Sequence, residues 1–280
     1  MWHWHKSASA AHESLWQERL QRFPGAVISA GYKAGRIALD VYTEQAEEAL
    51  VLQALYGGQA TPLAETDWVA ATAPEQSPPL LIRQKLVLTT SESPQELERL
   101  RQQYPGRILL SLPAEQAFGT GNHATTATCL RLLCDAAAQL PNPWSLIDVG
   151  CGTGVLALAG LKLGAAHAEG FDFDPKAVEV ARRNIARNGG ADELRLFQAD
   201  VFEWEPAAPA DVVLANLFST VLQRAFPRLL RALKPGGRLI ISGILREQAT
   251  ETLAAAQAVG LTVDKSITRG KWTTAQLHRP

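Results

Sequence analysis

Short apolar runs alternate with longer helix-like segments along the C-terminal part of the chain. The apolar runs predict strands at 145–149, 167–171, 194–198, 210–215 and 238–242. The segments around them predict helices at 125–140, 155–163, 175–188, 221–233 and 248–259. Strands separated by helices of this length form a mostly parallel sheet. Two neighbouring strands at the end, 261–268 and 272–278, predict an antiparallel edge of that sheet.

The N-terminal part has the pattern of a small α+β unit. It predicts helices at 11–23 and 43–56 and strands at 26–30 and 36–42. Farther along the chain, strands are predicted at 86–90 and 107–112 and a helix at 94–104. A stretch rich in Ala, Thr and Pro at 69–82 predicts a linker. We therefore expect an α/β protein with a doubly wound, mostly parallel seven-stranded sheet and a small N-terminal α+β domain. The expected limits are 1–68 for the small domain, 69–113 for the linker and connecting elements, and 114–280 for the sheet domain.

The composition narrows the class of function. The 280 residues are 46% hydrophobic and 20% charged, with a net charge of −1. A packed core is therefore expected, and tight generic binding to nucleic acid is not. No apolar stretch reaches the roughly 18 residues that a membrane span needs, and the N-terminus lacks the apolar core of a signal peptide. We expect no membrane partner and a cytoplasmic location.

The cysteines and the N-terminal histidines indicate neither disulfide bonds nor a metal site. Cys129, Cys134 and Cys151 form an odd set without regular spacing, which fits reduced cytoplasmic thiols better than a disulfide framework. Cys129 and Cys134 lie on a predicted helix, as small buried residues do. His3 and His5 form a His-x-His pair near the start of the chain. Because two ligands without a third are weak evidence for a metal site, we expect an ordinary, partly ordered terminus and no metal.

A glycine-rich turn follows the strand at 145–149. Residues 146–154 read Leu-Ile-Asp-Val-Gly-Cys-Gly-Thr-Gly, and Asp172 follows the next strand. Glycines let the backbone come close to a ligand because no Cβ blocks the approach. The second acid can accept hydrogen bonds from a ribose diol. This arrangement predicts half of a doubly wound nucleotide-binding fold, although a tight strand–helix turn without a ligand is the plainer alternative.

The spacing of this turn indicates which ligand it binds. A dinucleotide fingerprint has the spacing Gly-x-Gly-x-x-Gly, whereas Gly150, Gly152 and Gly154 are spaced Gly-x-Gly-x-Gly after Asp148. An acid beside the loop would repel a pyrophosphate and suits a positively charged cofactor such as S-adenosylmethionine. A P-loop is excluded because no Gly-Lys-Ser/Thr follows. The same spacing disfavours a nicotinamide dehydrogenase.

Other polar residues follow the later strands. Asp200, with Val201 beside it, would flank the adenine, and Asn216 lies where a methyl donor should meet its acceptor. Asp200 could instead cap a turn, and Asn216 could belong to an Asx-turn. Upstream, residues 117–126 form a polar loop that leads into a helix, where Thr126 would bond the methionine moiety. As an alternative, Thr125 or Thr126 is only a helix N-cap.

Together these motifs are similar to those of the ribosomal protein L11 methyltransferase family. The motifs are Phe-Gly-Thr-Gly-x-His-x-Thr-Thr at 118–126, Asp-x-Gly-Cys-Gly-Thr-Gly at 148–154, Asp-x-Asp-Pro at 172–175, Ala-Asn-Leu at 215–217 and Ser-Gly-Ile-Leu at 242–245. The resemblance covers roughly residues 114–280. It implies a class I S-adenosylmethionine-dependent methyltransferase in which the small N-terminal domain recognises a ribosomal protein.

The resemblance also implies roles for single residues. Cofactor contacts carry over to Thr126, Gly150, Asp172 and Asn216, and a loop with Thr120, Gly121 and His123 would lie over the cofactor. The full predicted cofactor-binding set is Thr120, Gly121, Thr126, Asp148, Gly150, Gly152, Gly154, Asp172, Phe173, Asp200, Val201 and Asn216.

The implied reaction is N-methylation of a lysine or another amino group of a ribosomal protein. In-line positioning and a neutral amine are the main requirements. The catalytic candidates are Asn216, which would orient the amine, and His123 as a proton acceptor. Alternatives are methylation of another protein lysine or of a small molecule, or a non-catalytic cofactor-binding homologue. The oligomeric state and the number of methyl groups are left open.

Overall fold

A computed structural model describes residues 2–20, 23, 26–30, 35–43, 45–62, 78–113, 124–190 and 193–280. The chain divides into two compact units, Met1–Glu75 and Gln76–Pro280, which are described separately. The domain limits expected from the sequence stay a prediction. None of the described helices is long and apolar enough to cross a membrane.

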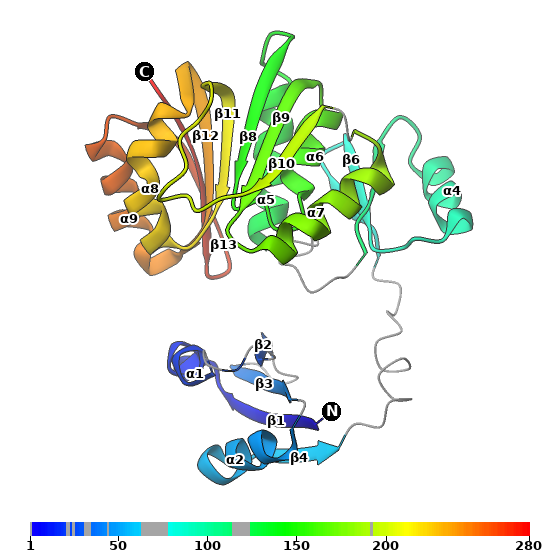
Figure 1. Cartoon of the computed structure of the whole chain (residues 1–280), viewed down its shortest axis with the longest axis vertical. Helices are drawn as coiled ribbons and strands as arrows, with labels where there is room; N and C mark the ends of the chain where they lie inside the picture. Colours follow the sequence, from blue (N-terminus) through cyan, green and yellow to red (C-terminus); the bar gives the residue numbers. More distant parts are fainter. Residues whose placement is uncertain are drawn as a thin grey trace. The chain divides into compact units, whose positions relative to one another are not determined.

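A seven-stranded sheet forms the centre of the larger unit (Figure 1). Its strands are β8 (Trp144–Val149), β9 (Ala165–Asp172), β10 (Leu194–Gln198), β11 (Ala210–Asn216), β12 (Leu233–Leu245), β13 (Thr262–Arg269) and β14 (Trp272–His278). Their order is β10-β9-β8-β11-β12-β14-β13. β14 runs antiparallel to both of its neighbours, β12 and β13, whereas the remaining pairs of neighbouring strands are parallel. The predicted doubly wound, mostly parallel sheet is confirmed.

Helices cover both faces of this sheet. They are α5 (Ala124–Ala137), α6 (Val155–Lys162), α7 (Pro175–Asn188), α8 (Ser219–Arg231), the short 3₁₀ helix η2 (Arg246–Gln248) and α9 (Ala249–Ala258). One core contains Leu146 and Leu214 together with residues of α5 and α6. The other core contains Ile147 and Val213 together with residues of α8. Successive residues of a strand point to opposite faces of the sheet. Because helices cover both faces, both sets of side chains are buried, and the strands read as continuous apolar runs.

Local sequence signals set the bounds of α7. Pro175 occupies the first turn, where its missing N–H has no partner to lose. The Asp174 side chain caps the helix by accepting a hydrogen bond from the Lys176 N–H at 2.9 Å. Gly189, with φ of 70°, follows the last helical residue. These signals explain why the predicted helix agrees with the structure at both ends.

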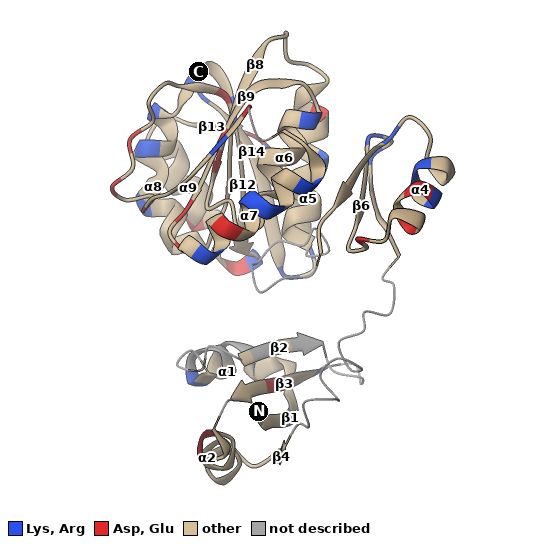
Figure 2. Ribbon diagram, turned by 45° about the vertical axis from the view of Figure 1, so that its right-hand side comes forward, with Lys and Arg blue, Asp and Glu red and all other residues tan. Residues whose placement is uncertain are grey.

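The larger unit also contains a second sheet, which has three strands. This sheet consists of β5 (Leu80–Ile82), β6 (Leu86–Thr89) and β7 (Ile108–Ser111), with α4 (Pro94–Gln103) between β6 and β7. Its buried leucines share a core with α5 and α6. The Asn188 side chain also accepts from the Ser111 N–H and donates to the Ser111 carbonyl, both at 2.8 Å. β5 lies partly within the stretch 69–82, which the sequence predicts to be a linker, so the sequence does not predict this strand. Acidic and basic residues are interspersed on α4 (Figure 2).

The smaller unit contains a four-stranded antiparallel sheet in the order β2-β3-β1-β4. Its elements are β1 (Trp2–Ser9), a 3₁₀ turn (Ala10–His12), α1 (Glu13–Leu20), β2 (Ala26–Ala30), β3 (Arg36–Thr43), α2 (Ala46–Tyr56) and β4 (Gln59–Pro62). The small α+β domain is confirmed, but the expectation of a partly ordered terminus is wrong. Trp4 is fully buried and its indole N–H donates to the Gly57 carbonyl at 2.9 Å, which anchors β1 inside the sheet.

Candidate functional site

The parallel strands bring the predicted site residues to one edge of the large sheet. Val149 at the end of β8 pairs with Phe171 of β9 and with Ala215 of β11, and Asp172 pairs with Gln198 of β10. The residues that follow these strand ends are therefore neighbours. The strand order reverses between β8 and β11, which is the position where doubly wound sheets bind ligands.

The glycine loop is shaped by its own packing as well as by any ligand. Gly150, Gly152 and Gly154 have φ of 69°, 53° and 75°, a backbone region that residues other than glycine rarely adopt. A Cβ on Gly150 would overlap Leu217, and a Cβ on Gly154 would lie 2.9 Å from the Ala181 Cβ. The first and third glycines are thus required by the fold, so the triplet alone does not establish a ligand.

Asp172 holds this loop against the end of β9. Its Oδ2 accepts a hydrogen bond from the Gly152 N–H at 2.9 Å, and its Oδ1 accepts from the Asp174 N–H at 3.0 Å. An ionised carboxylate has about four acceptor positions, so two of them remain for hydroxyl groups. The next residue, Phe173, follows the end of β9 and is 71% exposed.

Asp148 is completely buried beneath the loop. Its Oδ2 accepts from the Ala157 N–H of α6 at 3.1 Å, whereas its Oδ1 has no hydrogen-bond partner among the described residues. Burial raises the pKa of Asp148 to about 7, against the Ala157 hydrogen bond and with help from the charge of Asp172. The negative charge invoked from the sequence is therefore only partly present near neutral pH.

Asn216 and Thr126 meet although 90 residues separate them. The Asn216 amide donates to Thr125 Oγ1 at 3.3 Å and to Thr126 Oγ1 at 3.5 Å. The helix α5 begins at Ala124, so both threonines lie inside it. Neither threonine is the helix N-cap that the alternative interpretation proposed. The Asn216 Oδ1 atom is buried and has no hydrogen-bond partner in the described part of the chain. A buried polar atom without a partner in a native protein calls for an explanation, and a role in a site is one of those known.

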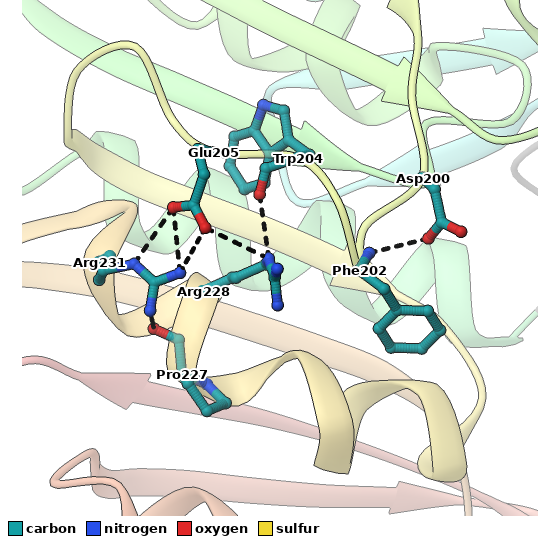
Figure 3. A network of polar contacts seen from close by, with 7 residues as sticks. All are labelled: Asp200, Phe202, Trp204, Glu205, Pro227, Arg228 and Arg231. Atoms are coloured by element: carbon teal, nitrogen blue, oxygen red, sulfur yellow. Dashed lines mark hydrogen bonds and ion pairs between the residues drawn. The ribbon is translucent and has the colours of Figure 1, made fainter.

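Asp200 caps the turn after β10. Its Oδ1 accepts from the Phe202 N–H at 2.8 Å (Figure 3). Its carbonyl oxygen accepts from the Trp204 N–H at 2.8 Å. The Arg228 guanidinium donates to the Trp204 carbonyl at 3.2 Å and thereby braces this turn. The alternative role of Asp200 as a turn cap thus accounts for one of its two carboxylate oxygens. The adenine contacts of Asp200 and Val201 stay a prediction.

Three predicted residues, Thr120, Gly121 and His123, lie outside the described residues. In contrast, the structure adds a contact that the sequence argument did not assign. Gly243 in β12 has φ of 83° and touches the backbone of Leu217, whose N–H donates to the Ser242 carbonyl at 3.1 Å. The Ser242 hydroxyl in turn bonds Thr274 at 2.6 Å. The sequence signal for this support beneath Asn216 is the Ser-Gly pair at 242–243, where the predicted strand at 238–242 ends.

This strand order, with an antiparallel strand next to the edge, and this site define a methyltransferase of the doubly wound class. The family described as "Ribosomal protein L11 methyltransferase (PrmA)" matches residues 5–280. The chain belongs to this family, as the motifs in its sequence indicated.

Curated relatives support the assignment. A protein named ribosomal protein L11 methyltransferase from Chromobacterium violaceum is 36% identical over 262 residues, which are 89% of this chain and 80% of the relative. One with the same name from Dechloromonas aromatica is 35% identical over 82% of this chain and 75% of its own length. A solved ribosomal protein L11 methylase from Lactobacillus delbrueckii subsp. bulgaricus has a TM-score of 0.62 and 23% identity, and covers 72% of this chain and 99% of its own. That likeness shows the fold.

Proposed function

We propose that this methyltransferase transfers methyl groups from S-adenosylmethionine to amino groups of ribosomal protein L11 in the cytoplasm. The supporting observation is the buried, unpartnered Oδ1 of Asn216, whose amide is engaged by Thr125 and Thr126. Leaving a buried acceptor unpaired costs about 1–3 kcal/mol. An amine that enters the site donates an N–H to this oxygen and removes that cost. The names of the relatives point to ribosomal protein L11 as the source of the amine.

The residues around the glycine loop suit the cofactor. When bound, S-adenosylmethionine supplies a methyl group on a positively charged sulfur. Asp172 retains acceptor capacity for the ribose hydroxyls, and Asp148 Oδ1 is a buried acceptor for the ammonium group. Gly150, Gly152 and Gly154 form the loop beside them, and Phe173, Asp200 and Val201 would flank the adenine. Thr120, Gly121, Thr126 and Asn216 complete the proposed set.

Asn216 would act by orienting the amine. A lysine ammonium has no lone pair, so it must lose a proton before it can attack the methyl carbon. A site of low dielectric favours the neutral amine because burial disfavours the charged form. The fixed Asn216 carbonyl can then direct the lone pair toward the methyl group, which is the positioning effect that in-line transfer requires. His123 is proposed as the proton acceptor.

Mass spectrometry of purified L11 incubated with the full chain and labelled S-adenosylmethionine tests the proposal. We expect methyl increments on L11 amino groups. Asn216→Ala should lower the rate of methyl transfer by about 10²-fold. The cofactor dissociation constant measured by calorimetry should rise much less than the rate falls, because Asp172 and the glycine loop still hold the cofactor. Asp172→Ala should abolish cofactor binding. Asp264→Ala is the matched control, because Asp264 pairs with His278 at 2.6 Å on β13 and β14.

Three results would contradict parts of this proposal. Normal cofactor affinity in Asp172→Ala would refute the ribose contact. Label on a different protein or a small molecule of a lysate, with none on L11, would refute the substrate. Cofactor binding without any label transfer would identify a non-catalytic homologue.

A further inference from the structure

Three potential metal ligands lie together on one sheet of the N-terminal unit. The His3 Nε2 and His5 Nδ1 atoms are each 2.8 Å from Asp40 Oδ1. One ligand atom from each of the three residues lies within 4.8 Å of the others. The third ligand, which the sequence alone did not reveal, therefore comes from β3.

Strand pairing explains how these residues meet. β1 and β3 are antiparallel, with His5 opposite Asp40 and His3 opposite Tyr42. Because side chains alternate between the two faces of a strand, His3 and His5 share a face while Trp4 between them enters the core. Leu39 and Val41, on either side of Asp40, are fully buried in that same core. The hydrophobic pattern thus fixes all three polar residues on the opposite face.

The site is partly sheltered and one of its ligands is oriented. The side chains of His3 and Asp40 are 23% and 18% exposed and that of His5 is 44% exposed, so a solvent ion can reach them. The Tyr42 ring stacks on the His3 ring with centroids 4.7 Å apart and planes 8° apart. Contacts that orient ligands in this way strengthen metal sites.

We propose that His3, His5 and Asp40 bind a divalent transition-metal ion of the Zn²⁺ type. Two imidazoles and a carboxylate are a ligand set that suits Zn²⁺, whereas Mg²⁺ and Ca²⁺ prefer oxygen ligands throughout. With metal–ligand distances of about 2.0–2.2 Å, the ion takes the place of the two hydrogen bonds after a small outward rotation of the side chains. Water completes the coordination. The ion joins β1 to β3.

The test is Zn²⁺ titration of the full chain, freed of metal with a chelator and carrying no histidine tag. Calorimetry should show one site. His3→Ala and Asp40→Asn should each weaken binding by at least about tenfold, since even outer contacts contribute 10–100-fold. His278→Ala is the matched control, because its pair with Asp264 lacks a third ligand within the described residues. It should bind Zn²⁺ as the unmodified chain does.

A spectroscopic measurement separates metal binding from a loss of folding. Co²⁺ added to the unmodified chain should produce visible absorption bands from nitrogen and oxygen ligands, and these bands should disappear in Asp40→Asn. Circular dichroism of the metal-free variants should match that of the unmodified chain. Absence of a stoichiometric site, or equal Zn²⁺ affinity in a folded Asp40→Asn variant, would overturn the proposal and leave a hydrogen-bonded triad.

Discussion

Gly243 offers a sharp test of how β12 supports the catalytic edge. A Cβ on this residue would lie 2.8 Å from the Leu217 carbonyl carbon and closer still to its oxygen. Ordinary contact begins at 3.4 Å and the Leu217 oxygen would lie 2.4 Å from this Cβ, so Leu217 must retreat by about 1 Å. Leu217 directly follows Asn216 and its side chain packs against Gly150, so the substitution displaces the proposed orienting group and also disturbs that side of the cofactor loop.

The expected cost of Gly243→Ala has two parts. A side chain at φ of 83° adds about 1–3 kcal/mol of backbone strain. The forced contact with Leu217 adds about 1–3 kcal/mol of overpacking. We therefore expect a loss of about 2–6 kcal/mol in the free energy of unfolding. Since a misplacement of about 1 Å can cost about 10²-fold in rate, we also expect methyl transfer to fall about tenfold or more.

Gly236→Ala separates these two parts. Gly236 lies in the same strand with φ of 74°, but a Cβ there would have no neighbour within 4 Å. It should therefore lose only the strain contribution and keep its methyl-transfer rate. Urea unfolding and initial rates of L11 methylation, measured on both variants, test this. Equal stability losses and equal rates in the two variants would refute the role of the Gly243–Leu217 contact.

Three further predictions follow from burial. Because the pKa of Asp148 is raised to about 7 while an unfolded aspartate titrates near 4, the folded chain retains a proton between these values. The free energy of unfolding should fall as pH rises from 4 to 7, by up to about 4 kcal/mol relative to Asp148→Asn. Urea unfolding at several pH values measures this, and the same pH dependence of stability in the unmodified chain and in Asp148→Asn would contradict it. Trp4→Ala should destabilise the N-terminal unit by about 3–5 kcal/mol. Proteolysis within residues 2–62 should then be faster, while the larger unit keeps its cofactor affinity. Equal rates of proteolysis in the variant and in the unmodified chain would argue against it. The three buried cysteines, whose pKa values burial raises (to about 12 for Cys129), should not react with a thiol reagent until denaturant is added; rapid reaction of the native chain would disprove their burial.

The sequence by itself determined most elements of the larger unit. Apolar runs of strand length, the Pro175 and Asp174 signals of α7, and the glycine turn are local features, and local features are readable without contacts. The fold class and the edge at which Gly150, Asp172 and Asn216 gather follow from the alternation of helices and strands. The family resemblance added roles for single residues, which remain to be tested.

Only the tertiary structure decided which distant residues meet. Short strands such as β5 contain too few residues to show a hydrophobic periodicity. The sequence does not predict β1 because Trp4, which anchors it, is buried in a core formed by the distant elements α1, β3 and α2. The bonds from Asn216 to Thr125 and Thr126, and the contact of Gly243 with Leu217, depend on strand order and register. Asp40 approaches His3 and His5 for the same reason. Pairing between remote strands is set by burial of shared apolar faces, and no single segment contains that information.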